Sequence, residues 1–250
     1  MKTLKLLLFL LFPTMVIAQV PKTDITKPKR VEDNFLNDTI FEKDSSDPQL
    51  INITVRNPKG GIVSQGKMKG NKKEGVWREY SSTGLLTVLE EYKNGVKNGS
   101  ALKFGPGNQI SIDATYKNDS LNGQKTTYGT NSKIRSIENY KNGTLEGNRK
   151  AFYEDGKVQE DCNYKNGKKD GKAIWYLQNG QPSVEYNYTD GTLNGYAKEF
   201  SPKGAILREG NFKNDNEEGE WILYEDSNVT KKVIYKNGEI VKAAVIPQKK

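Results

Sequence analysis

The chain of 250 residues contains no histidine and only one cysteine, Cys162. The lack of histidine excludes Ser-His-Asp and Cys-His catalytic arrangements, as well as metal sites that use imidazole ligands. A single cysteine forms neither an internal disulfide bond nor a zinc site built from thiolates. We expect Cys162 to be a small packed residue, and a disulfide bond between two molecules is the alternative. Because these site residues are missing, an enzyme is the least favoured class of function, and no metal or cofactor is expected.

Apolar residues are also scarce, at 34% of the chain against 28% charged residues. This composition favours a thin, two-faced structure over a thick globule. The one long apolar run, residues 6–12, follows Lys2 and Lys5 and precedes a small-residue cleavage site that ends at Ala18. The pattern is typical of a secretory signal peptide, because the run is too short to span a bilayer. The sequence therefore predicts a secreted or periplasmic, cell-envelope protein, and an N-terminal anchor left in place is the alternative.

Basic residues exceed acidic ones without forming a block. Removal of residues 1–18 leaves 37 basic and 31 acidic side chains, a net charge of +6 that is spread over the chain. A solvated surface is favoured over a nucleic-acid patch, which would gather its lysines and arginines on one face. We therefore expect no nucleic-acid partner.

A short motif recurs through most of the chain. Tyr164-Lys165-Asn166-Gly167 is repeated with few changes at a step of 24 residues, the last step being 23. Self-similarity at this period is typical of repeat architectures. We call the first residue of each copy the anchor; the anchors of the seven full repeats are Met68, Tyr92, Tyr116, Tyr140, Tyr164, Tyr188 and Phe212. A second ring follows twelve residues after each anchor: Tyr80, Phe104, Tyr128, Phe152, Tyr176, Phe200 and Tyr224.

Glycine marks two further positions of the repeat. It stands seven residues after every anchor, and Gly or Asn stands sixteen residues after six of the seven anchors. These residues tolerate positive φ, so the sixteenth position indicates a left-handed turn residue at the end of a three-residue hairpin loop. Ser132 is the exception, and Asn131 beside it is the alternative left-handed residue. The repeat is therefore predicted to be a β-hairpin.

The turn predicts which residues face one another across the hairpin. The second ring should pair with Leu86, Ile110, Ile134, Val158, Pro182, Ile206 or Thr230. Continued inwards, this register sets Leu102 against Ile112 and, as a misfit, Lys198 against Arg208. It also places anchor and second ring on one shared face, with Trp77, Trp175 and Trp221 on the other.

The predicted fold is all-β: an elongated single antiparallel meander of stacked hairpins. The expected divisions are a signal peptide (1–18), a flexible leader (19–48) in which a weakened copy of the pattern survives around Asp44, a degenerate capping hairpin (49–67), seven repeats (68–234), and a C-terminal capping strand and tail (235–250). Within the cap, strands are expected at 50–55 and 61–65, and a last strand at 239–246. Atypical terminal units are what a repeat array needs as caps.

The recurring Tyr-Lys-Asn-Gly-x-x-x-Gly-x-x-x-x-aromatic frame, followed by Gly-x-aliphatic, resembles the MORN repeat. It is most similar to the bacterial MORN-variant repeat of YwqK-type, toxin–antitoxin-associated proteins. The resemblance is clearest over Tyr164 to Tyr186 and extends from Met68 to Gly238. It implies an elongated sheet of hairpins that acts as a scaffold or binding surface for protein or lipid, and it implies no catalytic residues. A signal peptide departs from the cytosolic antitoxin pattern.

Two functions follow as hypotheses. The first is an exported, non-catalytic scaffold that binds a protein partner in the cell envelope, in an antitoxin- or immunity-like role. The second is a module that binds lipid headgroups or glycans, suggested by the net charge and by the lysine beside most anchors. The aromatic rows are either the core of the array or a stacking platform, and both hold if the face is only partly covered. The candidate binding residues are Tyr92, Phe104, Tyr116, Tyr128, Tyr140, Phe152, Tyr164, Tyr176, Tyr188 and Phe200.

Overall fold

The fold is described from a computed structural model, in which residues 38–225 and 228–246 are placed. The strands of the first half are β1 (Asp38–Lys43), β2 (Leu50–Arg56), β3 (Ile62–Lys69), β4 (Lys72–Tyr80), β5 (Leu86–Lys93), β6 (Val96–Phe104), β7 (Ile110–Lys117), β8 (Ser120–Tyr128), β9 (Ile134–Lys141) and β10 (Thr144–Leu145). Those of the second half are β11 (Gly147–Phe152), β12 (Val158–Lys165), β13 (Lys168–Tyr176), β14 (Pro182–Thr189), β15 (Thr192–Leu193), β16 (Gly195–Phe200), β17 (Ile206–Lys213), β18 (Asn216–Glu225), β19 (Asn228–Lys236) and β20 (Glu239–Val245). Two 3-10 turns, Pro106–Asn108 and Thr130–Ser132, lie in the loops after β6 and β8.

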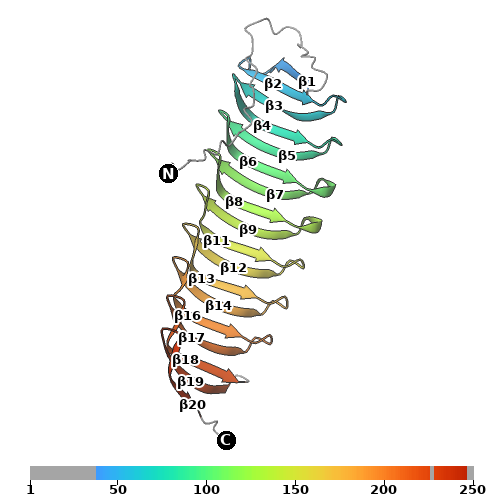
Figure 1. Ribbon diagram of the computed structural model, residues 1–250. Coiled ribbons are helices and arrows are strands. Elements are labelled where there is room, and N and C mark those ends of the chain that lie inside the picture. The colour runs from blue at the N-terminus through green and yellow to red at the C-terminus, as the bar shows by residue number, and fades with distance from the viewer. Residues whose placement is uncertain (1–37, 226–227, 247–250) are drawn as a thin grey trace, which may run out of the picture.

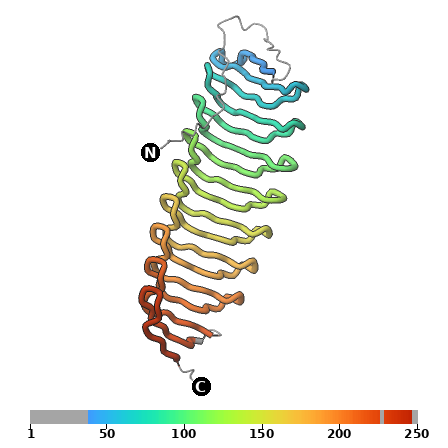
Figure 2. Tube along the Cα trace, in the orientation of Figure 1, coloured from blue at the N-terminus to red at the C-terminus, as the bar shows by residue number. Residues whose placement is uncertain are grey.

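All these strands belong to one open antiparallel sheet. Each strand pairs with the next along the chain, and the short strands β10 and β15 are continued by β11 and β16 against the same neighbours. The hairpins stack from β1 at one end to β20 at the other, which gives an elongated ladder (Figure 1). The Cα trace shows the same hairpin recurring along its length (Figure 2). The predicted all-β meander is therefore confirmed.

Tight turns close one edge of the ladder, which we call the turn edge. In the turn Asn166-Gly167 both residues have positive φ, 50° and 80°, as a two-residue hairpin loop requires. Asp119 and Asp215 take the place of this glycine in two repeats, with φ values of 63° and 67°. Three-residue loops close the other edge, the loop edge. There Gly156 has a φ of 89°, while Asn131 and Ser132 are both left-handed at 56°.

Each hairpin also contains bulges. Between β12 and β13, Cys162 pairs with Ala173 and Tyr164 with Lys169, so that three residues lie opposite Asn163 alone. Gly171 lies in this bulge with a φ of 89°. All seven glycines at this position have positive φ, namely Gly75, Gly99, Gly123, Gly147, Gly171, Gly195 and Gly219. The repeated glycine is therefore a bulge residue, which bends and twists the strand.

The predicted register is correct at the loop and wrong further in. Phe152 pairs with Val158 as predicted, and the corresponding predicted pair forms in five other full repeats. Beyond that pair Ala151 lies opposite Glu160, because Gln159 is an extra, bulged residue. The same one-residue shift sets Leu102 opposite Asp113 and Lys198 opposite Glu209. The expected clash of Lys198 with Arg208 thus becomes a salt bridge of 3.5 Å to Glu209.

The last hairpin departs from the prediction in another way. Tyr224 pairs with Val229 rather than Thr230, and Glu225 pairs with Asn228. The loop there is one residue shorter than in the other repeats, which accounts for the step of 23. Its two residues, 226–227, lie outside the described chain.

The prediction that anchor and second ring share a face is wrong. The ring of Trp175 lies 6.4 Å from that of the anchor Tyr188, so both are on the same face. Tyr176 follows Trp175 in the same strand and therefore points to the other face. The physical reason is the bulged residue, since one extra residue reverses the in–out alternation between second ring and next anchor. We call the two sides the anchor face and the opposite face.

The core lies on the anchor face. Every buried hydrophobic residue in the described chain belongs to it: Ile53, Trp77, Ala101, Ala114, Cys162, Ala173, Ala197, Phe212, Trp221 and Val233. The three tryptophans expected on the face without anchors thus lie on the anchor face, because the bulge moves them there, and Trp77 and Trp221 are buried in the core. The prediction that Cys162 is packed is confirmed, since its exposed fraction is 0%. Towards the C-terminal end, Tyr186, Phe212, Trp221 and Tyr235 form successive edge-to-face ring contacts at 5.1–6.1 Å.

The terminal hairpins are partly as expected. Strands β2 and β3 lie where the two strands of the first hairpin were expected, and β20 lies where the last strand was expected, ending at Val245. Strand β1, however, lies inside the segment 19–48 that was assigned to a flexible leader. Its Phe41 pairs with the buried Ile53, so this strand is held by the same packing as the repeats. The signal peptide and the leader up to residue 37 lie outside the described residues.

Candidate binding surfaces

Several anchor rings are half-buried and lie beneath cations from the preceding repeat. The ammonium group of Lys73 lies 4.6 Å from the ring centre of Tyr92, and that of Lys169 lies 5.4 Å from Tyr188. Lys97 stands in the same relation to Tyr116, also at 5.4 Å. Each lysine is five residues after its own anchor, so the repeat places it over the next ring. Such cation–π contacts are attractive and cover the ring faces.

Carboxylates complete this arrangement. Glu90 accepts hydrogen bonds from the hydroxyl of Tyr92 at 2.7 Å and from Nζ of Lys97 at 2.6 Å. Burial raises the pKa of the Glu90 carboxyl, but these hydrogen bonds outweigh burial and hold the pKa below its ordinary value. The pKa of Tyr92 is raised by burial and by the neighbouring carboxylate. The tyrosine is therefore a neutral donor and the glutamate an ionised acceptor.

In the middle of the array the charges form a continuous row. Glu138 binds Lys125 at 3.0 Å and Arg149 at 3.3 Å, and Arg149 also binds Glu160. Glu160 in turn lies 3.4 Å from Lys169. These side chains are mostly shielded from solvent, with 14–27% of their surface exposed. The anchor face thus satisfies its own charges and rings, which favours the interpretation of the anchors as core.

The second rings form a separate surface on the opposite face. Each is half-buried and lies beside an aliphatic residue of the next strand, such as Leu86 beside Tyr80 or Val158 beside Phe152. Ile110 and Ile134 in this row are 36% and 38% exposed. Among the described residues, the ring–ring contacts all lie on the anchor face. We call this row the apolar stripe; it consists of Tyr80, Leu86, Phe104, Ile110, Tyr128, Ile134, Phe152, Val158, Tyr176, Pro182, Phe200 and Ile206.

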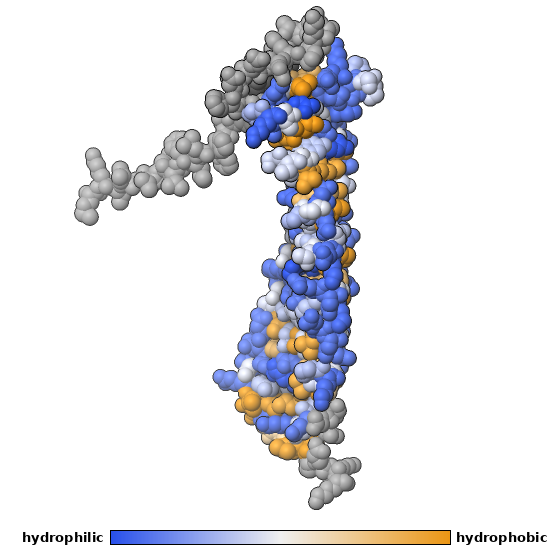
Figure 3. All heavy atoms as spheres, turned by 90° about the vertical axis from the view of Figure 1, so that its right-hand side faces the viewer, coloured by the Kyte–Doolittle hydropathy of each residue, from blue (hydrophilic) through white to orange (hydrophobic). Residues whose placement is uncertain are grey.

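The ten candidate residues are therefore not one platform. Tyr92, Tyr116, Tyr140, Tyr164 and Tyr188 lie on the anchor face, and Phe104, Tyr128, Phe152, Tyr176 and Phe200 lie in the apolar stripe. Their role in binding stays a prediction, and it now concerns two surfaces rather than one. Viewed edge-on, the ladder is narrow, and hydrophobic side chains alternate with hydrophilic ones along it (Figure 3).

A column of lysines follows the turn edge. The residue after the anchor is an exposed lysine in every repeat except the one with Thr189, and within the described chain none of these lysines pairs with a carboxylate. Two strands separate successive members, so they lie about 10 Å apart. We call them the lysine column: Lys69, Lys93, Lys117, Lys141, Lys165, Lys213 and Lys236.

Hydrogen bonds between repeats hold the turns that carry this column. The amide of Asn166 donates to Oε2 of Glu146 at 2.8 Å, and the amide of Gly167 donates to the carbonyl of Leu145 at 2.9 Å. Asp190 bonds in the same way to Asp170, at 3.1 Å. Sequence reasoning missed this role of the sixth residue after the anchor, although its frequent Asp, Glu or Asn was a usable signal. The lysine column therefore lies on an ordered edge.

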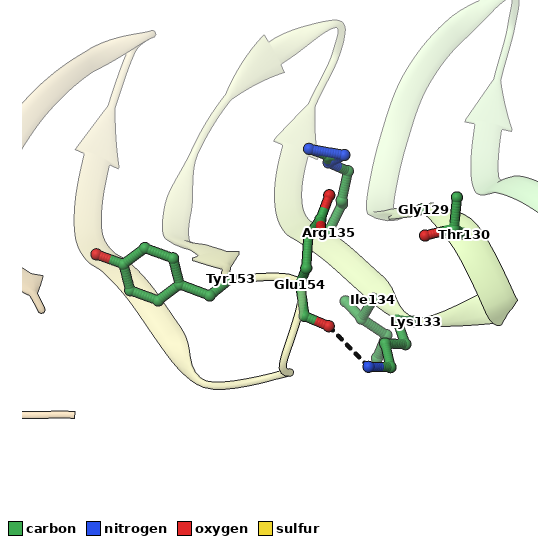
Figure 4. Close-up of a pocket in the computed structure, with 7 residues that line it drawn as sticks. All are labelled: Gly129, Thr130, Lys133, Ile134, Arg135, Tyr153 and Glu154. Atoms are coloured by element: carbon green, nitrogen blue, oxygen red, sulfur yellow. Dashed lines mark hydrogen bonds between the residues drawn. The ribbon is translucent and has the colours of Figure 1, made fainter. Parts of the chain in front are cut away.

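One hollow in the described residues is shallow and open to solvent. It lies on the loop edge, is lined by Gly129, Thr130, Lys133, Ile134, Arg135, Tyr153 and Glu154, and holds about 220 Å³ with open solvent included. Lys133 donates to the carbonyl of Glu154 at 2.8 Å across it, while the ring of Tyr153 points away (Figure 4). The hollow is smaller than a typical ligand pocket, and its bond joins two successive loops.

Two searches of the described residues for particular features were negative. No group of three or more His, Cys, Asp or Glu residues in residues 38–225 and 228–246 is arranged to hold a metal ion. The same residues contain no helix long and apolar enough to span a bilayer.

Comparison with known proteins identifies the repeat. Residues 145–166, 169–190 and 193–214 each match the model of the MORN repeat variant family. No curated protein matches the chain. The matched segments run from the residue five after one anchor to the turn after the next, and so cover the bulge, the second ring and the loop. The YwqK-type assignment stays a prediction. Three consecutive segments of the chain match the MORN repeat variant, within a ladder that continues the same period on both sides.

Proposed function

We propose that this protein is an exported, non-catalytic scaffold that binds a protein partner in the cell envelope through the apolar stripe. MORN variant repeats support the scaffold role, because a single-layer sheet offers long regular surfaces. The N-terminal sequence supports export. Non-catalytic action is proposed because the sequence contains no histidine for a Ser-His-Asp or Cys-His arrangement.

The observation that carries the protein-binding role is the difference between the two faces. On the anchor face, lysines lie over four of the anchor rings, and carboxylates pair with three of these four lysines. The apolar stripe lies along six repeats with its aromatic and aliphatic side chains only half covered. A long apolar surface of this kind is typical of an interaction site. Flat stacking of rings on aliphatic neighbours suits an extended peptide or a second sheet better than a small molecule.

Crosslinking and pull-down from envelope fractions tests this function. The bait is the full chain, and the variant Ile110→Lys/Ile134→Lys places two charges at the most exposed aliphatic positions of the stripe. We expect the wild-type chain to capture a defined envelope protein and the variant to lose it at least tenfold. The cause is the desolvation of two ammonium groups against an apolar partner.

Thr189→Lys/Thr192→Lys is the matched control. It adds the same charge on the turn edge, at positions where other repeats already carry lysine, such as Lys165 and Lys168. Equal capture by both variants, or no envelope protein captured by the wild-type chain, contradicts the proposal. In a finer form, the partner is a toxic protein and the role is immunity-like; the captured protein should then inhibit growth only when this chain is absent.

A second candidate function rests on the lysine column. Seven exposed lysines at a regular spacing, without acidic partners in the described chain, favour an anionic surface such as lipid headgroups or a charged glycan. Binding to vesicles with anionic lipid should weaken steeply with salt, since exposed charges are screened. Changing Lys93, Lys117, Lys141 and Lys165 to Gln should abolish this binding and leave protein capture intact. Binding that does not respond to salt contradicts this candidate.

A further inference from the structure

The last strand of the ladder is an unusually apolar edge. All seven residues of β20 are exposed, and Ile240, Val241 and Val245 are 58%, 59% and 78% exposed. Among the described residues β20 pairs with β19 alone. Exposed β-branched edge strands pair readily with a further strand, and most proteins protect such an edge with charges or proline. Five of the seven residues of β20 are apolar, and Lys242 is the one lysine among them.

Within the described chain, β1 is the terminal strand at the other end of the sheet. β1 pairs with β2 alone within the described chain. Phe41 of β1 lies on the anchor face, because it pairs with the buried Ile53. Ala243 of β20 lies on the same face, because it pairs with the buried Val233. The two ends therefore present matching faces.

The backbone of the two ends is also complementary. The amide of Ile246 points to Thr230 on β19, so by alternation the amides of Ala243 and Val245 point to the open edge. The amide of Asp44 points to Leu50 on β2, so those of Phe41 and Thr39 point outwards. Antiparallel pairs that exchange hydrogen bonds need two outward-pointing residues, and Ala243–Phe41 and Val245–Thr39 meet this condition.

The register inside the array predicts the same pairs at the joint. Between β13 and β14, Ala173 lies opposite the ring of Tyr186 on the anchor face. Ala243 opposite Phe41 reproduces this small-against-aromatic pair. The same register sets Lys242 opposite Glu42 on the other face and Ala244 opposite Ile40. One register thus satisfies faces, hydrogen bonds and charges together.

We propose that copies of this chain join end to end, with β20 of one copy pairing antiparallel to β1 of the next. The joint continues the meander, so it joins different surfaces of two identical copies and is repeated at each end. A head-to-tail contact of this kind builds an open filament unless the rotation closes a ring. The proposal does not depend on the partner or on the location of the protein.

Sedimentation velocity over a range of protein concentrations tests the joint. The wild-type chain, as produced by its host cell, should show mass that rises with concentration in multiples of the single chain. Lys242→Glu places two carboxylates opposite each other and should weaken association roughly five- to tenfold. Glu42→Lys should do the same. Lys93→Glu, the same charge change on the turn edge, should leave association unchanged.

Mixing provides the specific readout. An equimolar mixture of the Lys242→Glu and Glu42→Lys chains has complementary charges at both kinds of joint and should recover wild-type association. Two copies joined β20 to β20 would not respond to Glu42→Lys, because Glu42 lies in β1 and outside such a joint.

Val245→Pro removes an outward amide without touching the bonds to β19 and should abolish association. A chain that stays a single copy at all concentrations overturns the proposal. So does association that withstands Val245→Pro and both charge changes.

Discussion

The indole ring of Trp221 lies directly against the backbone of Gly210 on the neighbouring strand. A Cβ atom at Gly210 would be 2.3 Å from the ring, and Trp221 itself has an exposed fraction of 0%. Near the N-terminal end, Gly66 and Trp77 show the same relationship, with 2.4 Å between the would-be Cβ and the ring. Between these two sites, Tyr186 occupies the glycine position and Ala197 the tryptophan position, while other repeats carry pairs such as Cys162 with Ala173 and Glu138 with Arg149. Where one member of the pair is an aromatic ring, the other is therefore Gly or Ala.

This size exchange predicts a compensating double substitution. Gly210→Ala should lower the free energy of unfolding by about 2–3 kcal/mol, because the ring has no room to move. Trp221→Ala should cost about 3–5 kcal/mol through the cavity it leaves. The double variant Gly210→Tyr/Trp221→Ala reproduces the pair found at residues 186 and 197 and should be more stable than Trp221→Ala alone. Urea unfolding of the variants measures this, and strictly additive losses would argue against the exchange.

The bulge glycines give a prediction about backbone conformation alone. A Cβ at Gly171 would meet nothing closer than 3.9 Å, but its φ of 89° is unfavourable for other residues. Gly171→Ala should therefore cost about 1–2 kcal/mol in unfolding free energy. Gly105→Ala is the matched control, since Gly105 has a φ of −102° and similar space, with Ser111 at 3.6 Å. Equal effects in thermal or urea unfolding would contradict a backbone origin.

Two salt bridges should contribute unequally to the free energy of unfolding, because one is shielded from solvent in the charge row and the other is exposed. Glu138 accepts bonds from Lys125, Arg149 and Tyr140 in a shielded environment. Glu138→Gln should cost about 1–3 kcal/mol, because it leaves buried donors without a charged acceptor. Glu220 bonds to Lys232 with about half of each side chain exposed, so Glu220→Gln should cost less than about 0.5 kcal/mol. Similar losses for the two variants would show that shielding is unimportant here.

The dependence of stability on pH follows from the same row. Burial raises the pKa values of Glu90, Glu138 and Glu160, but hydrogen bonds and cations outweigh it, so all three lie below the ordinary 4.5. The unfolded chain then binds more protons than the folded chain in acid. The stabilisation is present above pH 4.5 and is lost as pH falls through the lower folded-state values. Urea unfolding between pH 2 and 7 measures this fall, and Glu138→Gln should make it shallower.

At alkaline pH the free energy of unfolding should fall as the pH rises, the opposite direction to the fall in acid. Burial and a neighbouring carboxylate raise the pKa of Tyr186 from 10.0 to about 12 and that of Cys162 from 9.0 to about 12. The unfolded chain therefore loses these protons first. Stability should be constant up to about pH 9 and fall between pH 9 and 12. Absorbance of tyrosinate, compared between the wild-type chain and Tyr186→Phe, provides the check, because Tyr186 with its raised pKa of about 12 should ionise late in the folded chain.

Much of the fold can be predicted from this sequence because each repeat contains the residues that specify its two turns. Asn-Gly at one edge and the left-handed glycine at the other define the hairpin, and seven copies define the stacking. The pair of Phe152 with Val158 follows from the loop alone. The inner pairs do not follow, because Gln159 carries no signal that separates a bulged residue from a paired one. Because the bulge was not predicted, the tryptophans were assigned to the wrong face, and two separate surfaces were predicted to be one.

The sequence by itself determined the period, the all-β meander, the turn residues and the lack of catalytic histidine and paired cysteine. These are local properties, set by residues that tolerate positive φ and by residue types that are present or absent. Only the tertiary structure decided which rings share a face, which charges neutralise one another and how the two ends match. Those properties depend on which face of the sheet each residue of a strand points to. A single bulged residue reverses this alternation, and nothing in the composition indicates that it is there.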